Sequence, residues 1–423
     1  MNPRGYLLES FAAAVKAADP IHMVPQHLPN PPQGRTFVVG AGKASAAMAL
    51  AVENAWPANA QLDGLVVTRY GHTLPTSKIK VVEAGHPIPD ESGEQASRQI
   101  LAAVKALKSE DLLLCLFSGG GSSLLSLPID GISLPELKQV TRQLLRCGAS
   151  IQEINTVRKH LSAIQGGKLA ATCKAPILAL IISDVTGDEV THIASGPCTP
   201  DPTTFSDALA VLDRYNLDVP PTIRQILLAG KEHAVAETPK PGSPVFMHVE
   251  NRIIANAHQS LIASANYFQG LNIDTLILGD TVTGESREIA KSYAALAREI
   301  RLYPQLLKAP IALLSGGETT VTIKGNGRGG RNSEFLLSLL IELAGLERIY
   351  ALACDTDGID GTENNAGALI TPDSFIRVKK LELNAATFLA NNDSYTFFQQ
   401  LNDLVITGPT YTNINDYRAI LIL

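Results

Sequence analysis

Short apolar runs alternate with longer stretches of helical periodicity along most of the chain, and the apolar runs end in glycine or polar residues. Because they are short and bounded by turn-forming residues, these runs predict buried strands. The expected strands begin at Thr36 and cover 62–68, 111–117, 177–182, 253–255, 275–279, 311–314, 319–323 and 349–354. The expected helices include 43–56, 91–107, 134–147, 151–169, 257–268, 286–303 and 334–346. This alternation predicts a doubly wound α/β fold, in which ligands bind outside the carboxyl ends of the strands.

The segment 237–244 (ETPKPGSP) interrupts this rhythm with three prolines and a glycine. A chain of 423 residues is too long for one ordinary core. We therefore predict two domains, 1–236 and 245–423, separated by this segment.

The N-terminal residues predict an amphipathic helix rather than a signal peptide. Its apolar face comprises Leu7, Leu8, Phe11, Ala14, Val15 and Ala18, and Glu9 and Lys16 interrupt any continuous apolar run. No apolar run elsewhere reaches the roughly 18 residues that a membrane span needs. The expectation is a cytoplasmic protein without a membrane partner.

The composition narrows the classes of partner. Hydrophobic residues make up 45% and charged residues 18%, which is typical of a globular protein. The net charge is −6 and only 5% of residues are aromatic, so a nucleic-acid partner is not expected. Five scattered cysteines without a CxxC pair argue against disulfides or zinc and for a reducing compartment. Cys115 and Cys354 lie in apolar runs and are expected in the core.

The stretch 315–335 (SGGETTVTIKGNGRGGRNSEF) combines glycines, cations and a helix start. Its first two glycines predict a tight turn, and Asn332 or Ser333 is expected to cap the following helix. Backbone amides, a fixed cation and a helix N-terminus together predict an anion site, with a glycine-rich hairpin and solvated arginines as the alternative. The candidate substrate- or phosphate-binding residues here are Gly316, Gly317, Glu318, Gly330 and Asn332.

Two more glycine-rich turns follow expected strands. Lys43 begins a helix after a turn that matches neither the Walker A nor the GxGxxG pattern. A cation at a helix N-terminus is unfavourable unless an anion lies between them. The turn 118–123 (SGGGSS) is an amide-rich nest with three hydroxyls, and it lacks the GxSxG order of a serine hydrolase. An exposed lysine and a plain tight turn are the alternatives. The candidate binding residues are Gly42, Ser118, Gly119, Gly120, Gly121 and Ser122.

Charged residues complete the pattern. Arg158 lies in a basic helical segment and is a binding candidate, although such segments are most often solvated helix faces. Acidic residues follow several expected strands. Asp184, Asp355 and Asp357 are candidate ligands for Mg²⁺, which takes one or two carboxylates together with water and phosphate oxygens. For Asp360 a capping role is favoured over metal binding. Amide nests, cations and acids in this density predict phosphoryl transfer.

Nine sequence blocks resemble a known family. They are VVGAGKA, EAGHPIPDESG, FSGGGSSLL, VRKHLSAIQGGKLA, SDVTGDEVTHIASGP, PDPTTF, LSGGETTVTIKGNGRGGRNSEF, DTDGIDGTENNAGALI and TGPTYTNINDYR. In this order, between about residues 36 and 418, they resemble the class II glycerate kinases, the glycerate 2-kinase family with a C-terminal MOFRL domain. The resemblance implies ATP-dependent conversion of D-glycerate to 2-phosphoglycerate. It also implies a Rossmann-like N-terminal domain and a smaller α/β C-terminal domain, with the active site in the cleft.

The resemblance implies that Lys43 and Arg331 are the central cations, and Asp188 is the third candidate catalytic residue. Glycerate has a carboxylate that a guanidinium would recognise, and both Arg158 and Arg331 fit that role. Two departures, Cys198 after IASGP and Tyr411 in GPTxTN, bear on substrate preference without removing a charge. The general base, the assignment of the nests to ATP or glycerate, the nucleotide donor and the oligomeric state, a homodimer included, stay open.

Two other functions compete with the kinase. Some members of the family carry the older label hydroxypyruvate reductase, an NAD(P)-dependent activity. Against it, no GxGxxG follows the first strand, and no acidic residue stands clearly at the expected ribose position. A non-catalytic sensor of sugar acids or nucleotides would not require this density of acids and cations.

Overall fold

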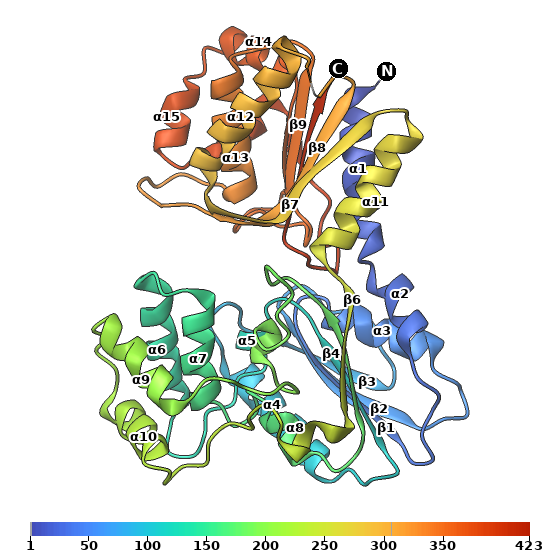
Figure 1. Cartoon of the computed structure of the whole chain (residues 1–423), viewed down its shortest axis with the longest axis vertical. Helices are drawn as coiled ribbons and strands as arrows, with labels where there is room; N and C mark the ends of the chain where they lie inside the picture. Colours follow the sequence, from blue (N-terminus) through green and yellow to red (C-terminus); the bar gives the residue numbers. More distant parts are fainter. Residues whose placement is uncertain (1, 306) are drawn as a thin grey trace. The chain divides into compact units, whose positions relative to one another are not determined.

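The computed structural model describes residues 2–305 and 307–423, which divide into two compact units (Figure 1). The N-terminal unit is Pro20–Ile254, and the C-terminal unit combines Met1–Asp19 with Ala255–Leu423. This division differs from the predicted boundary at 237–244. Residues 245–254 stay with the N-terminal unit because β6 (Val249–Ala255) joins its sheet. Helix α1 (Pro3–Ala17) belongs to the C-terminal unit because its apolar face is buried in that unit's core.

The N-terminal unit is built on a six-stranded sheet in the order β3-β2-β1-β4-β5-β6. Its first five strands are parallel: β1 (Thr36–Ala41), β2 (Leu62–Arg69), β3 (Ile79–Ala84), β4 (Leu112–Phe117) and β5 (Ile177–Ile182). Every residue of β1, β4 and β5 is buried, as expected for central parallel strands. The Rossmann-like prediction is confirmed, although β3 was not foreseen.

The helices of this unit fall into two groups. Figure 1 shows α6, α7, α9 and α10 gathered together, and they share an apolar core of their own. The predicted helix 151–169 is wrong in length, because Gly166 and Gly167 adopt positive φ and separate α7 from α8. The helical segments are α2 (Pro20–Met23), η1 (Val24–His27), α3 (Ser45–Ala55), α4 (Glu91–Lys105), α5 (Gly121–Leu124), α6 (Leu134–Arg146), α7 (Ile151–Leu161), α8 (Lys168–Thr172), η2 (Ile193–Ser195), α9 (Phe205–Arg214), α10 (Pro221–Lys231) and η3 (Pro244–His248).

The C-terminal unit has a mixed sheet in the order β11-β10-β9-β12-β8-β7. Strands β7 and β8 are parallel, whereas β12 is antiparallel to both of its neighbours. The strands are β7 (Asp274–Glu285), β8 (Ile311–Thr320), β9 (Ile349–Asp355), β10 (Gly367–Ile370), β11 (Leu404–Val405) and β12 (Asp416–Ile422). The central strand β12 was not predicted, so the sequence missed the antiparallel character of this sheet.

Helices cover both faces of the second sheet (Figure 1). Along β8, Leu313 lies in the core with α12 and α13, and Leu314 lies in the opposite core with α1 and α11. The helices besides α1 are α11 (Ala257–Gly270), α12 (Ser286–Leu302), α13 (Arg331–Leu343), α14 (Pro372–Lys380), α15 (Ala385–Ala390) and α16 (Ser394–Leu401).

The predicted tight turn at Gly316 and Gly317 is wrong, because β8 continues through both residues. A Cβ atom on Gly317 would lie 2.3 Å from the carbonyl oxygen of Val282 on β7. The glycine therefore permits close approach of two strands rather than a reversal of the chain. Cys115 and Cys354 are fully buried, which confirms their expected place in the core. None of the helices in the described part of the chain has the length and apolar character needed to span a bilayer.

Candidate functional site

The carboxyl ends of β1, β4 and β5 lie at one edge of the N-terminal sheet. In the parallel register Ala41 is beside Phe117, and Phe117 is beside Ile181. From β1 the chain builds β2 and β3 on one side, then crosses back to place β4 on the other side. The gap between β1 and β4 is therefore a topological switch point, where ligands bind in open α/β sheets. The two glycine-rich turns of the N-terminal unit meet here.

Direct contacts join these two turns. The Lys43 amide donates to the Gly119 carbonyl at 2.8 Å, and the Ala44 amide donates to Ser118 Oγ at 3.0 Å. A Cβ on Gly42 would lie only 2.1 Å from Ser118 Oγ, so this position requires glycine. The amides of Lys43 and Ala44, just before α3, are thus used inside the protein.

The second turn keeps open amides. Among the residues that the structure describes, the backbone amides of Gly119, Gly120 and Ser122 donate no hydrogen bond. Gly120 has φ 82°, and a Cβ there would lie 2.8 Å from His86 Nε2 and 3.6 Å from Lys43 Cγ. Unpaired amides beside a lysine are the arrangement that binds phosphate oxygens. His86 lies in one of the quoted sequence blocks without being singled out there, and the fold brings it to this turn.

A chain of polar side chains leads from the second turn to Arg158. The Ser122 and Ser195 hydroxyls are 2.8 Å apart, and Ser195 Oγ donates to Asn155 Oδ1 at 3.0 Å. The same Asn155 oxygen accepts from Arg158 Nη1 at 2.8 Å. Asn155 and Ser195 are completely buried, whereas Ser122 and Arg158 are half-buried. The two ends of the chain are therefore accessible and its middle is fixed.

Arg158 is a half-buried arginine whose charge is not neutralised by a carboxylate of the described residues. No carboxylate of the described residues pairs with it, and Asn155 is its side-chain partner. Burial lowers the pKa of Arg158 to about 10, which still leaves the guanidinium protonated at neutral pH. The solvated helix face considered for this segment is not what the structure shows.

The neighbouring cations of the same segment are structural. Lys159 is buried and pairs with the buried Asp201 at 3.3 Å. His160 Nε2 lies 3.0 Å from Glu237 Oε1. Lys168 donates to the carbonyls of Lys159 and Ser162, and burial lowers the pKa of its ammonium to about 8. These contacts use the charged groups of Lys159, His160 and Lys168 within the N-terminal unit. Arg158 bonds instead to the neutral side chain of Asn155.

The glycine-rich loop of the C-terminal unit uses its amides internally. The amides of Lys324 and Gly325 donate to Asn392 Oδ1 at 2.8 and 3.0 Å, and the Gly327 amide donates to the Asn391 carbonyl at 2.9 Å. A Cβ on Gly325 would lie 2.3 Å from that same carbonyl oxygen. These glycines allow the loop to pack against the turn before α16, which explains them without a ligand.

Arg331 sits among carboxylates. Its Nε lies 2.8 Å from Asp416, its Nη2 lies 2.8 Å from Asp355, and its Nη1 lies 3.5 Å from Glu318. The second oxygen of Asp416 accepts from the fully buried Arg418 at 2.5 Å. Burial alone would lower the pKa of Arg331, but Asp416, Asp355 and Glu318 together raise it well above its usual value. Its charge is neutralised within the protein, which the sequence did not foresee.

The N-terminus of α13 is capped by a carboxylate of the same unit. Asp360 accepts from the amides of Asn332 and Ser333 at 3.0 and 2.8 Å and from Ser333 Oγ at 2.6 Å. Asp360 therefore caps the start of α13 rather than its own turn, where the sequence had placed its capping role. The predicted cap at Asn332 or Ser333 is wrong, since the helix begins at Arg331 with Gly330 as its N-cap residue. A Cβ on Gly330 would lie 2.2 Å from Asp360, so the glycine makes room for this carboxylate.

The remaining acidic candidates follow β5 and β9. In the C-terminal unit, Asp355 Oδ1 accepts from the Asp357 amide at 3.0 Å, and Asp357 Oδ1 accepts from the Ile359 amide at 2.8 Å. In the N-terminal unit, Asp184 and Asp188 are half-buried in the loop after β5, where Asp188 has φ 56°. Within the described ranges, no group of three histidine, cysteine or acidic residues is arranged to hold a metal.

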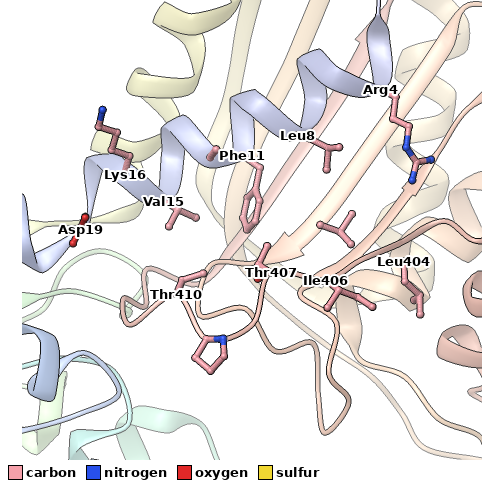
Figure 2. Close-up of a pocket in the computed structure, with 13 residues that line it drawn as sticks. Arg4, Leu8, Phe11, Val15, Lys16, Asp19, Leu404, Ile406, Thr407 and Thr410 are labelled. Atoms are coloured by element: carbon pink, nitrogen blue, oxygen red, sulfur yellow. The ribbon is translucent and has the colours of Figure 1, made fainter. Parts of the chain in front are cut away.

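A cavity of about 630 Å³ lies within the C-terminal unit, between α1 and the segment 404–410 (Figure 2). Figure 2 shows Leu8, Phe11 and Val15 of α1 facing it, with Leu404 and Ile406 opposite. The candidate site residues do not line this cavity. Its lining is mainly apolar, with Arg4, Lys16 and Asp19 among the lining residues, and it includes none of the glycine-rich turns.

Several residues that build the site were not singled out from the sequence, among them Asn155, Ser195, Asp416 and Arg418. Asn155 lies just before the block that contains Arg158, and the other three lie inside quoted blocks. The sequence blocks indicate which segments matter but not which side chains contact one another. Those contacts are seen only in the folded structure.

The chain is similar to two protein families and to several known proteins. Residues 6–228 match the family described as Domain of unknown function (DUF4147), and residues 311–416 match the MOFRL family. A D-glycerate 2-kinase of Thermotoga maritima is 38% identical over 97% of this chain and 96% of its own length. A provisionally named hydroxypyruvate reductase of Agrobacterium vitis is 49% identical over 100% of this chain and 95% of its own length. The crystal structure of a Thermotoga maritima glycerate kinase superposes with a TM-score of 0.88 at 37% identity, covering all of both chains.

Proposed function

This chain belongs to the class II glycerate kinase family, and we propose on that basis that it transfers the γ-phosphoryl group of ATP to the 2-hydroxyl of D-glycerate. The products are 2-phosphoglycerate and ADP. The observation that carries the proposal is the match to a D-glycerate 2-kinase over 97% of this chain. An ATP-dependent enzyme of this kind is expected in the cytoplasm, and size-exclusion chromatography would show whether it forms the homodimer that the sequence left open.

The edge of the N-terminal sheet supports phosphoryl transfer, in which the protein mainly positions groups and neutralises charge. We propose that the open amides of Gly119, Gly120 and Ser122 bind phosphate oxygens and that Lys43 neutralises charge on the transferring group. The other residues of these turns shape the backbone. Asp188, in the loop after β5, stays a proposed catalytic residue, and the general base stays open.

Arg331 keeps a place in the proposal with a changed role. Its bonds to Asp355 and Asp416 make it the group that holds these carboxylates in position. The C-terminal unit keeps as proposed binding residues Glu318, Gly316, Gly317, Gly330 and Asn332.

A divalent cation accompanies ATP in this proposal. Mg²⁺ uses one or two protein carboxylates, and water and phosphate oxygens complete its coordination, so it does not need a dedicated cluster. The half-buried Asp184 of the N-terminal unit has the required chemistry and stays a candidate ligand. Asp355 and Asp357 of the C-terminal unit stay candidate ligands in their own right. When bound, the cation would neutralise phosphate charge.

The position of phosphorylation can be tested directly. Supplying enolase without phosphoglycerate mutase should yield phosphoenolpyruvate, because enolase accepts the 2-phosphate and not the 3-phosphate. Formation of phosphoenolpyruvate only after addition of mutase would show that the 2-position assignment is wrong.

The reductase is the second candidate because the relative with 49% identity carries that name. NAD-binding sheets of this order place an acidic residue near the end of the second strand to bind the ribose. Here β2 ends in Thr68 and Arg69, which disfavours NAD. Incubation with hydroxypyruvate and NADH or NADPH would reveal this activity through the loss of absorbance of the reduced cofactor.

A further inference from the structure

A kinase for a hydroxy acid must recognise two anions, the phosphates of the nucleotide and the carboxylate of the acceptor. The sequence left Arg158 and Arg331 as equal candidates for the carboxylate. In the structure Arg331 already contacts three carboxylates, whereas Arg158 pairs with none among the described residues. A guanidinium attracts an anionic ligand strongly only when its charge is not already neutralised.

The surroundings of Arg158 hold it in place without using up its charge. Its Nη1 donates to Asn155 Oδ1, and this leaves the other guanidinium nitrogens for a ligand. The orientation of the Asn155 amide is fixed, because Oδ1 also accepts from Ser195 and Nδ2 donates to the His192 carbonyl at 3.3 Å. Asn155 is therefore an uncharged side chain that orients the Arg158 guanidinium.

Ser195, which bonds to Asn155, lies in a turn with a strained backbone. Ala194, Ser195 and Gly196 all have positive φ, at 50°, 57° and 59°. The Gly166 and Gly167 amides donate to the carbonyls of Ser195 and Gly196 at 3.0 and 2.7 Å and so fix the turn. Strained non-glycine residues persist where the surroundings over-determine them, and they gather at functional sites. Here the strain places Ser195 Oγ between Asn155 and Ser122.

The hydroxyl of Ser195 connects Asn155 to Ser122. Ser195 has one hydroxyl proton, and the Asn155 oxygen can only accept, so Ser195 donates to Asn155. The Ser195 hydroxyl also lies 2.8 Å from the Ser122 oxygen, so this one hydroxyl contacts both Asn155 and Ser122. The turn with open amides and the guanidinium are thereby joined into one rigid unit. Phosphate-binding amides lie at one end and a carboxylate-binding fork at the other.

We propose that Arg158 binds the carboxylate of the hydroxy-acid substrate and that Asn155 and Ser195 are positioning residues for this guanidinium. The identity of the substrate rests on the proposed function, but the carboxylate subsite rests on these contacts. Because the nucleotide phosphates have the open amides and Lys43, loss of Arg158 should affect the acceptor and not ATP.

The test measures binding of D-glycerate and of ATP separately by calorimetry, together with KM and kcat. Arg158→Gln should weaken D-glycerate binding roughly 10- to 100-fold, the range for a lost charge-assisted hydrogen bond, and leave ATP binding unchanged. Asn155→Ala and Ser195→Ala should each cause a smaller loss in the same direction. Arg214→Gln is the matched control, because Arg214 lies in the same unit but pairs with Glu153, and it should change neither affinity.

A double variant separates positioning from a merely structural role. Because Asn155 acts through Arg158, the variant carrying both Arg158→Gln and Asn155→Ala should bind D-glycerate as Arg158→Gln does. Additive losses would overturn the positioning role. A loss of ATP affinity with D-glycerate binding intact would move Arg158 to the phosphates and overturn the subsite. Thermal melts of each variant show whether it is folded.

The proposed function can fail independently. A wild-type protein that binds D-glycerate through Arg158 without phosphorylating it would contradict the kinase and support the carboxylate subsite. A wild-type protein that phosphorylates D-glycerate with an unchanged KM in Arg158→Gln would support the kinase and overturn the subsite.

Discussion

The turn 118–123 and the loop 325–333 have similar sequences, with glycines beside hydroxyl-bearing residues just before a helix. Their surroundings differ. Among the described residues, the first keeps three unpaired amides and lies at one end of a polar chain that leads to an arginine without a carboxylate partner. The second gives its amides to Asn391, Asn392 and Asp360. Arg331, at its end, is bound to Asp355 and Asp416.

The difference teaches that a glycine-rich stretch with cations has two physical explanations. Glycine leaves amides exposed to a ligand, or it lets another part of the protein approach closely enough to use them. A Cβ on Gly329 or Gly330 would lie 2.2 Å from a neighbouring side chain, so the second explanation holds for the C-terminal loop. On this view the amides of the N-terminal turn bind an anionic ligand. The amides at the end of the C-terminal loop bind the carboxylate of Asp360 instead.

The largest expected effect is the loss of Lys43 at the open turn. Lys43→Ala should lower kcat roughly 10³-fold, because cations acting on the transferring phosphoryl group contribute about that much in related enzymes. The enolase-coupled assay measures it. Lys105→Ala, in the last turn of α4, is the control and should retain wild-type kcat. Retention of most of the kcat by Lys43→Ala would remove the open turn from the chemistry.

Arg331→Ala should affect stability as well as activity. Removing one partner of a buried ion pair leaves uncompensated charge on Asp416 and Asp355, with an expected loss of about 3 kcal/mol in the free energy of unfolding. Urea denaturation measures this loss. Arg331→Lys should recover it only in part, because an ammonium cannot bind both carboxylates as a planar fork does.

Arg328→Ala is the control in the same loop. Arg328 pairs with Glu363 and stacks over Tyr395, but its side chain is 54% exposed. Its loss should change the free energy of unfolding by less than about 1 kcal/mol. If Arg328→Ala is crippled while Arg331→Ala resembles the wild type, the internal neutralisation of Arg331 does not matter as argued.

Asp360→Asn tests the role of the Asp360 carboxylate that caps α13. The amides of Asn332 and Ser333 lose a charged acceptor, so we expect a loss of roughly 1–2 kcal/mol in the free energy of unfolding. Sulfate should raise the melting temperature of this variant more than that of the wild type, because the helix N-terminus then lacks its anion. Asp373→Asn in the first turn of α14, where the carboxylate is 69% exposed, should show neither effect.

The smallest expected effect concerns the divalent cation. Asp184→Asn and Asp357→Asn should each raise the Mg²⁺ concentration needed for half-maximal activity without unfolding the protein. Asp355→Asn should do the same and also lower stability, because Asp355 holds Arg331. Mg²⁺ titrations in the coupled assay measure the shift. Unchanged titrations for all three variants would rule out these ligands.

Much of the framework could be predicted from the sequence because it depends on local pattern. Apolar runs such as 177–182 predicted buried strands, and the turns after β1 and β4 were expected at strand ends, where the register places them. The nine ordered blocks were sufficient to identify the family. Strand β12 was missed because its antiparallel place between β8 and β9 depends on pairing with distant segments.

The tertiary structure alone decided which cations and amides stay available. Arg331 is neutralised by a carboxylate 85 positions away, and Ser122 is joined to Arg158 through Ser195, 73 positions from Ser122. The charge on a side chain and the polarity of its nearest partner are set by contacts in space. No local pattern around Arg158 or Arg331 contains that information. The sequence determined the residue types and their order, and the fold determined which of them are left to bind a ligand.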